Sequence, residues 1–222
     1  MEKRVTSNKL AKKVYDIAFS ETGEFFVTAG VKTLKYWFFD RMDRPISTPG
    51  SANSEVKCMA SRTVDLAEMR GKTFVSVATA RGNVFALTED GLLCVCTPER
   101  TMDKWMDLHA SFGYTICAYG NLVACGCSNG VIRCFDADTL EHIITLPRPP
   151  PLGEANISPN SKKQIIATNV SCTFADTVAV MLFDNNQRLF SIYSDRTVFI
   201  WDIKRMERVS VHKSFFISLR CY

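Results

Sequence analysis

Long apolar runs are missing from this 222-residue sequence. No stretch approaches the roughly 18 consecutive apolar residues that a membrane-spanning helix needs. The basic segment 1–13 also lacks the apolar core that a secretory signal requires. We therefore expect a protein of a reducing compartment, the cytoplasm or the nucleus, with no membrane partner.

Common catalytic motifs are also missing. The sequence has no glycine-rich phosphate loop, no kinase catalytic loop and no Gly-x-Ser-x-Gly elbow. Histidine is scarce, because His109, His142 and His212 are the three in the chain and lie far apart. Nothing marks a nucleophile or an acid that would complete a catalytic set with any of them. The sequence predicts a protein that is not an enzyme and that uses no cofactor.

Charge of one sign is not concentrated anywhere. The formal net charge is +4, and the basic residues are scattered along the chain. A lysine does stand next to two aromatic residues at 35–37, as on a nucleic-acid surface. A half-buried strand explains that pattern equally well, and no RNA-binding signature is present. The sequence therefore argues against a nucleic-acid partner.

Nine cysteines are present, yet no Cys-x-x-Cys motif is among them. The Cys-x-Cys pairs at 94–96 and 125–127 would place both thiols on the same face of a strand, with no nearby histidine pair to complete a tetrahedral set. Most cysteines stand in apolar strand patterns, where thiols serve as small hydrophobic residues. We predict structural cysteines and no metal.

What the sequence does contain is a repeat: a polar turn, an alternating apolar strand and a closing aromatic residue. Segment 195–202 reads Asp-Arg-Thr-Val-Phe-Ile-Trp-Asp, and 129–136 reads Asn-Gly-Val-Ile-Arg-Cys-Phe-Asp. Weaker copies stand at 31–38 and 90–97. The second of these has lost its aromatic residue. This is the signature of WD40 repeats, each of which forms one small antiparallel sheet of a β-propeller.

The repeat predicts an all-β chain with about four blades. Helix is scarce, since only 64–70 and 101–108 permit a turn or two. His109 and His212 fall near the position where WD40 blades place a histidine, but each lacks the usual preceding glycine, which favours a structural or exposed role. We expect a tail of a preceding blade at 1–14, blades at about 15–40, 72–108, 114–146 and 177–211 within 15–222, and irregular loops at 41–71 and 147–176.

Four blades are few for a WD40 ring, which commonly has seven. An array of four would leave two sheet faces without a neighbour. Segment 215–219 also resembles the start of a following blade. We therefore expect an incomplete or truncated ring whose remaining blades belong to a longer parent chain. A compact ring of four blades that closes by itself is the alternative.

Several motifs together resemble the mitogen-activated protein kinase-binding protein 1 family of WD40 scaffolds. Phe25-Phe26-Val27-Thr28-Ala29-Gly30 and Lys35-Tyr36-Trp37-Phe38 carry the resemblance first. Motifs at 91–94, 104–106, 125–133, 146–149 and 193–196 then follow in that family's order. The resemblance implies a noncatalytic scaffold of c-Jun N-terminal kinase signalling or of spindle poles, with partners from the kinase pathway or the centrosome. In that family the kinase-docking elements lie mostly in a tail that this sequence lacks.

Partner binding is expected at one end of the propeller. In WD40 rings the turns before the Trp-ending strand face that end. The residues nominated as partner contacts are Glu89, Asp90, Ser128, Asn129, Asp195 and Arg196. Lys204-Arg205 followed by Val209-Ser210-Val211 also fits a kinase-docking peptide, although an outer propeller strand after a turn fits the same residues. Because fold does not fix function, an interaction module of an unrelated assembly, such as RNA processing or trafficking, is the alternative.

Overall fold

Four antiparallel sheets follow one another along the chain in the computed structural model, which describes residues 8–39, 59–151, 173–183, 185 and 187–213. Each sheet consists of four consecutive strands paired in chain order. The predicted fold class, an all-β WD40 propeller with an incomplete ring of four blades, is confirmed. The strands of the first two blades are β1 (Val14–Phe19), β2 (Phe25–Gly30), β3 (Thr33–Phe38), β4 (Ala60–Thr63), β5 (Phe74–Ala80), β6 (Asn83–Thr88), β7 (Leu92–Cys96) and β8 (Met102–Asp107).

The third and fourth blades repeat this arrangement. Their strands are β9 (Gly113–Tyr119), β10 (Leu122–Cys127), β11 (Ile132–Asp136), β12 (His142–Leu146), β13 (Thr177–Phe183), β14 (Arg188–Tyr193), β15 (Thr197–Asp202) and β16 (Glu207–Lys213). Two short 3-10 helices interrupt the described strands, η1 (Ala67–Met69) and η2 (Ser128–Gly130). No helix in the described part of the chain is long and apolar enough to cross a membrane.

The prediction of an irregular loop at 41–71 was wrong in one respect, because this segment contains the outer strand of the first blade. β4 pairs with β3 from Phe38 opposite Ala60 to Lys35 opposite Thr63. The four residues of β4 read Ala-Ser-Arg-Thr, and none of them is fully buried. An outer strand with so little apolar surface has no alternation that a pattern search could detect. Segment 40–58 lies outside the described residues.

The second segment that permitted a helical turn, 101–108, forms β8 instead. Its burial alternates residue by residue from Met102 to Asp107, which is the period of a strand. At the end of the other expected loop, 147–151 and 173–176 carry no strand. Most of that loop, the N-terminal tail 1–7 and segment 215–219 lie outside the described residues.

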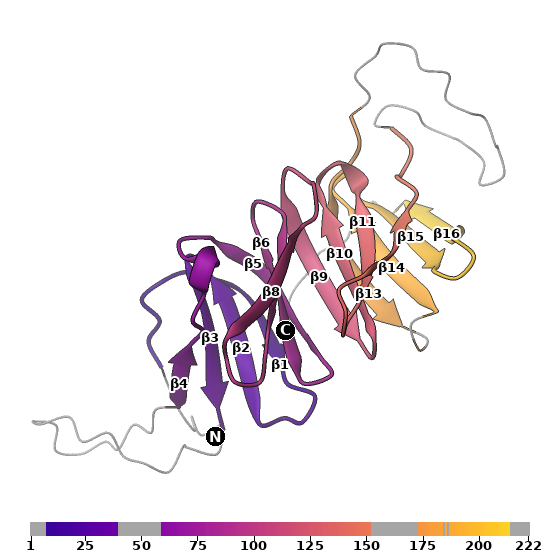
Figure 1. The fold of residues 1–222 in the computed structure, drawn as a ribbon. Coiled ribbons are helices and arrows are strands. Elements are labelled where there is room, and N and C mark those ends of the chain that lie inside the picture. Colours follow the sequence, from indigo (N-terminus) through magenta and orange to yellow (C-terminus); the bar gives the residue numbers. More distant parts are fainter. Residues whose placement is uncertain (1–7, 40–58, 152–172, 184, 186, 214–222) are drawn as a thin grey trace, which may run out of the picture.

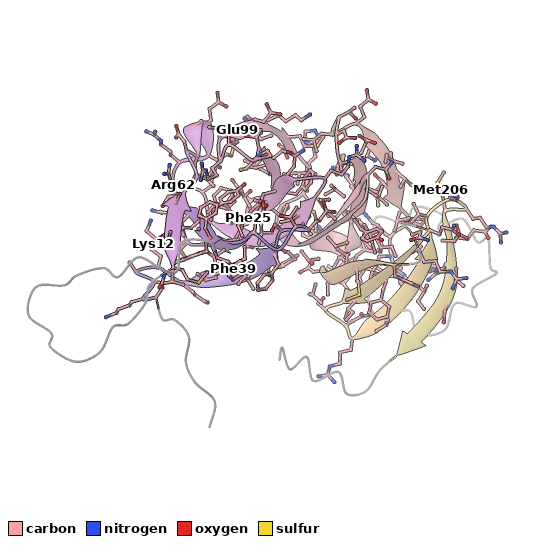
Figure 2. All side chains as sticks on the ribbon, turned by 90° about the horizontal axis from the view of Figure 1, so that it is seen from below. Lys12, Phe25, Phe39, Arg62, Glu99 and Met206 are labelled. Atoms are coloured by element: carbon pink, nitrogen blue, oxygen red, sulfur yellow. The ribbon has the colours of Figure 1, made fainter. Side chains whose placement is uncertain are left out.

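Neighbouring blades pack side by side through their first strands. β1 lies against β5, β5 against β9 and β9 against β13. Figure 1 shows the four sheets in an open arc, with the first and fourth blades at opposite ends. In Figure 2, Lys12 and Arg62 mark one end of this arc and Met206 marks the other.

Each gap between adjacent blades is filled by a buried apolar cluster. Between the first and second blades, Val27 and Tyr36 pack against Val84 and Cys94. Between the second and third blades, Phe85 and Leu93 pack against Val123, Cys125 and Phe135. Between the third and fourth blades, Leu122 and Ile132 pack against Leu189 and Trp201. Adjacent sheets are therefore held together by apolar burial, which covers both faces of the second and third blades.

Every blade turns one kind of face to the blade before it and another to the blade after it. We call these the preceding face and the following face. The last aromatic residue of the third strand lies on the preceding face, as Phe135 and Trp201 show. Trp37 holds the same register position in the first blade and donates to Thr28 Oγ1 at 3.0 Å, while Trp201 donates to Ser191 Oγ at 2.9 Å. The first and fourth blades therefore share the same internal bond.

Polar contacts connect the blades at the centre of the arc. The Ser76 hydroxyl on β5 donates to Asp16 Oδ2 on β1 at 2.7 Å, and the Val77 N–H donates to the same oxygen at 2.9 Å. The Ser76 oxygen also accepts from the Ile116 N–H on β9 at 3.2 Å. One buried serine therefore joins three consecutive blades.

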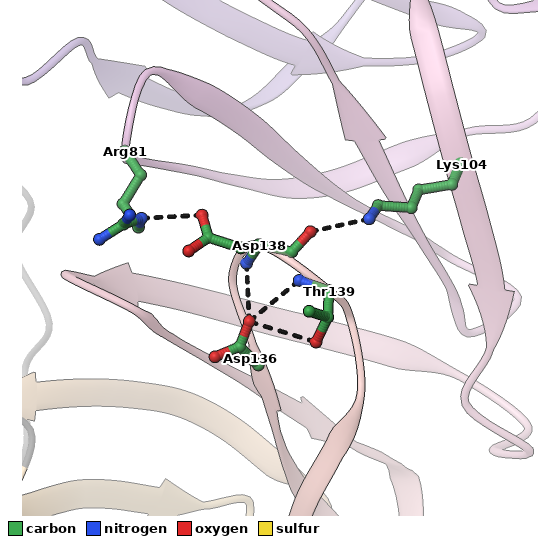
Figure 3. Close-up of polar contacts among 5 residues, drawn as sticks. All are labelled: Arg81, Lys104, Asp136, Asp138 and Thr139. Carbon is green, nitrogen blue, oxygen red and sulfur yellow. Dashed lines mark hydrogen bonds and ion pairs between the residues drawn. The ribbon is translucent and has the colours of Figure 1, made fainter.

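A second set of polar contacts joins the second and third blades at the surface. Arg81 Nε donates to Asp138 Oδ1 at 2.8 Å, and Lys104 Nζ donates to the Asp138 carbonyl at 2.8 Å (Figure 3). Asp136 Oδ1 accepts from the N–H groups of Asp138 and Thr139, each at 2.9 Å. Those bonds fix the turn that presents Asp138 to the neighbouring blade.

Candidate protein-interaction surface

The turns between the second and third strands of all four blades lie at one edge of the arc, which we call the top edge. In every blade an N–H of this turn donates to a carbonyl just before the first strand. The four bonds are Val31 N to Lys13 O at 3.0 Å, Glu89 N to Thr73 O at 2.9 Å, Ser128 N to Phe112 O at 2.9 Å and Ser194 N to Asp176 O at 2.9 Å. This repeated bond defines which residues of the four turns are equivalent.

Each of these turns contains a residue with a positive φ, and the turn of the third blade contains a second one, Gly130 at 68°. The residues and their φ values are Lys32 at 53°, Gly91 at 80°, Asn129 at 56° and Arg196 at 68°. At Gly91 a Cβ atom would also meet the Ala110 carbonyl oxygen at 2.7 Å, so only glycine fits there. The top edge is a row of tight turns held by the backbone.

The structure places Glu89 and Asp90 on the exposed part of this edge in the second blade. Asp90 accepts from Thr88 Oγ1 at 2.7 Å and pairs with the Lys72 ammonium. Partial burial alone would raise the pKa of Asp90, but the hydrogen bonds from Lys72 and Thr88 outweigh it, and this pKa lies below its usual range. Asp90 is therefore a fixed negative charge at neutral pH.

Ser128 is the one nominated residue that a partner cannot readily reach. It is buried, and its hydroxyl accepts from the Phe112 N–H at 3.2 Å. The nomination of Ser128 as a partner contact therefore needs correction, because this hydroxyl holds the turn against the preceding segment. Its neighbour Asn129 is exposed, and the Asn129 N–H donates to Asp176 Oδ1 at 2.8 Å.

Asp195 and Arg196 are both exposed at the top edge of the fourth blade. The Asp195 carboxylate accepts from the Thr197 N–H at 3.0 Å and from Thr197 Oγ1 at 2.7 Å. The Arg196 N–H donates to the Tyr193 carbonyl at 2.9 Å. These bonds fix the backbone of the turn and leave both side chains on the surface.

Asp176 contributes to this edge, although the sequence patterns did not nominate it. Its carboxylate accepts from the Tyr114 hydroxyl at 3.0 Å and from the Asn129 N–H at 2.8 Å, and its own N–H donates to Ser194 Oγ at 3.0 Å. Asp176 thereby joins the top edges of the third and fourth blades. It stands at the end of an irregular loop, where no pattern distinguishes one acid from another.

The described cysteines are packing residues. Cys94 and Cys96 lie in the cluster between the first two blades, and Cys125 and Cys127 lie in the next one, so each pair does point to a single face. Burial raises the pKa of Cys94 to about 12. Among the described residues no group of three or more histidine, cysteine or acidic side chains is arranged to hold a metal ion.

The histidines with described side chains lie on the surface. The His109 side chain is largely exposed, with Nδ1 3.5 Å from Asp107 Oδ2. His142 is exposed and shares a hydrogen bond of 2.8 Å with Thr145 Oγ1. His212 lies in β16, and its side chain is outside the described set.

The two alternative binding motifs have structural explanations. Lys204 and Arg205 lie in the turn before β16, and Arg205 N donates to Asp202 Oδ1 at 2.9 Å, as expected for an outer strand after a turn. In the aromatic pattern at 35–37, Tyr36 and Trp37 are buried and lie on opposite faces of β3. Bases would find no stacking platform there.

Comparison with known proteins reveals relatives in sequence. No family model matches the chain. Mouse (Mus musculus) mitogen-activated protein kinase-binding protein 1 is 32% identical over 92% of this chain, and mouse WD repeat-containing protein 62 is 31% identical over 98%. The chain spans 14% and 15% of the lengths of these two relatives. It is therefore similar to a limited part of two long WD40 proteins.

Solved structures show the same fold at low sequence identity. The structure of U3-55K aligns with 93% of this chain and 51% of its own, with a TM-score of 0.63 and 11% identity. The RRP9 WD40 repeats align with 90% of this chain and 49% of their own, with a TM-score of 0.61 and 10% identity. The computationally designed Ika4 protein aligns with 91% of this chain and 99% of its own at a TM-score of 0.61 and 15% identity. These likenesses concern the fold alone.

Proposed function

We propose that this chain, which belongs to the WD40-repeat family, is a noncatalytic interaction module of a scaffold for mitogen-activated protein kinase signalling or for spindle-pole organisation. The observation that carries the proposal is the sequence match to mitogen-activated protein kinase-binding protein 1 over 92% of the chain. The chain spans 14% of that relative, so the partner of this part is itself part of the proposal. The proposed location is the cytoplasm, including the spindle poles of dividing cells.

The top edge supports this function physically. Glu89, Asp90, Asn129, Asp195 and Arg196 stand exposed on turns whose backbones are fixed by hydrogen bonds. Rigid turns lose little conformational entropy on binding, and their charges can select a partner of complementary charge. We assign the partner contacts to these five residues.

A matched pair of arginines tests this assignment. Arg196 and Arg205 are both exposed and both stand in turns of the fourth blade, but Arg205 lies in the turn between β15 and β16 at the opposite edge. Binding of purified c-Jun N-terminal kinase to the chain would be measured by biolayer interferometry. We expect Arg196→Glu to raise the Kd at least 10-fold and Arg205→Glu to change it less than 2-fold.

Two results would contradict the proposal. Loss of binding with Arg205→Glu alone would move the contact to the docking-peptide motif. Absence of kinase binding, together with proximity labelling that recovers RNA-processing or coat proteins instead of kinase-pathway or spindle-pole proteins, would refute the scaffold assignment. Circular dichroism of both variants would check that each remains folded.

A further inference from the structure

Two blade faces at the ends of the arc have no neighbouring blade within the described chain. The first is the preceding face of the first blade, which we call the head face. It carries Ile17, Phe19, Phe26, Trp37 and Phe39. The second is the following face of the fourth blade, which we call the tail face; it carries Met181, Phe190, Ile192, Val198 and Ile200. Met181 is 62% exposed, whereas Ile192 and Val198 are buried at 9% and 5% exposure, so this face is open chiefly at Met181.

The head face is aromatic and partly open. Phe19 is 59% exposed and Ile17 is 48% exposed, although both lie on a first strand, where the other blades pack. The Phe19, Phe26 and Phe39 rings lie 5.5 to 6.3 Å apart and form one cluster. In the third blade the residue equivalent to Ile17 is Ile116, which packs against the second blade and is 6% exposed. Trp37 of the head face is itself only 4% exposed, in contact with Lys35 and Phe26, so the open part of this face lies on the first strand. The head face therefore offers an apolar surface on which another blade can pack.

The residues of the tail face hold the same positions in their strands as the residues through which the third blade packs on the fourth. Phe190 pairs with Ile200 next to the Leu189–Trp201 pair. In the third blade, Ala124 pairs with Cys134 next to the equivalent Val123–Phe135 pair. Ala124 and Cys134 are the residues that pack against the fourth blade. The tail face thus continues the interface already formed within the chain, with larger side chains.

Charges at the top edge fit the same junction. Between the third and fourth blades, the Asn129 N–H meets the Asp176 carboxylate. By the repeated top-edge bond, Asp195 is the equivalent of Asn129, and Lys13 is the equivalent of Asp176. Both Asp195 and Lys13 are exposed. A fourth blade that packs on a first blade would therefore bring opposite charges together at this position.

The size of the arc indicates how many copies can close. The chain aligns with 49% of the RRP9 WD40 repeats, so two copies provide about the repeat content of one such array. Head-to-tail contacts either close into a ring or continue as a filament, depending on the rotation between copies. We propose that two copies of this chain associate head to tail, with the tail face of each on the head face of the other, and close a ring of eight blades.

Light scattering coupled to size exclusion tests the assembly on the full 222-residue chain. We expect a mass of about twice 24.9 kDa at a chain concentration of tens of micromolar. Phe19→Glu on the head face and Met181→Glu on the tail face should each give a monomer. Ile143→Glu is the matched control, since Ile143 is 50% exposed on an outer strand of the third blade. This control should leave the dimer intact.

Mixing the two monomeric variants is the decisive step. The Phe19→Glu chain keeps its tail face and the Met181→Glu chain keeps its head face, so one intact junction can form and the mixture should yield a heterodimer. Asp195→Asn should weaken the wild-type dimer about 5-fold, since asparagine can also bond within such turns but carries no charge.

Three results would each overturn the proposal. A wild-type monomer at these concentrations would assign both faces to blades of a longer chain. A dimer that survives Met181→Glu but not Phe19→Glu would indicate contact between two head faces. A mixture that stays monomeric, with both variants folded by circular dichroism, would exclude the head-to-tail geometry.

Discussion

Replacement of Ser76 by alanine should destabilise the whole arc, because this side chain contacts three blades. The hydroxyl donates to Asp16 Oδ2 at 2.7 Å and accepts from the Ile116 N–H at 3.2 Å, and Ser76 is only 6% exposed. Removal of one partner leaves a buried polar group unsatisfied, at a cost of about 1–3 kcal/mol. The Asp16 carboxylate retains the Val77 N–H, which limits its share of the loss. We expect a loss of about 2–4 kcal/mol in the free energy of unfolding.

Urea denaturation followed by tryptophan fluorescence and circular dichroism measures this loss. A neutral mutation at Thr79 serves as the control: its hydroxyl also crosses between blades, donating to the Phe19 carbonyl at 2.6 Å, but at an exposed position. Thr79→Ala should cost less than about 1 kcal/mol, since water can replace the lost bond. A Ser76→Ala variant that loses no more than the control would refute the reasoning that this serine joins the blades.

Three further outcomes follow from the buried and charged groups. Tyr193→Phe should leave the free energy of unfolding in urea unchanged or raise it by up to about 1 kcal/mol, because the buried Tyr193 hydroxyl has no hydrogen-bond partner among the described residues. A large loss of stability would contradict this. Hydrogen bonds from the backbone N–H groups of Thr139 and Asp138 lower the pKa of Asp136 in the folded chain. The ionised Asp136 carboxylate therefore stabilises the fold above its unfolded pKa of about 3.9, and this stabilisation is lost as the pH falls through its folded pKa. The Asp136→Asn variant should therefore lose less stability than the wild type between pH 5 and pH 3, as measured by acid titration followed by circular dichroism. An equal loss in both proteins would contradict this. Because burial raises the pKa of Cys94 to about 12, iodoacetamide at pH 8 should label this thiol only after unfolding, and rapid labelling of the native chain by mass spectrometry would show otherwise.

The sequence predicted those parts of the fold that are both regular and half buried. The turn at 21–24 is of this kind, because it lies between two apolar strands and Gly23 has the positive φ of 73° that such a hairpin needs. The strand ending at Trp201 was identified because its apolar residues alternate and its closing residue is large. β4 was missed since an outer strand carries no apolar face. A lone Ala-Ser-Arg-Thr segment could equally be a loop.

The candidate surface was less predictable than the fold. Equivalent turns can be located from the repeat, and Asn129, Asp195 and Arg196 do stand exposed at one edge. Accessibility within a turn depends on which side chain closes it, and Ser128 turned out to be buried for that reason. Asp176 was not identified, since its role depends on Tyr114, which is 62 residues away in sequence. Contacts over such distances are determined by packing and leave no local pattern.

Each sheet of this protein is built from four strands that are consecutive in the chain, from β1–β4 to β13–β16. A whole blade can therefore be gained or lost as one continuous segment of sequence, because that segment forms an entire sheet. A duplication or deletion with ends between two sheets would keep every backbone ladder whole and would change only the side chains that meet at the new junction. Variation in blade number along such a lineage then depends on the fit of two surfaces, which few substitutions can adjust.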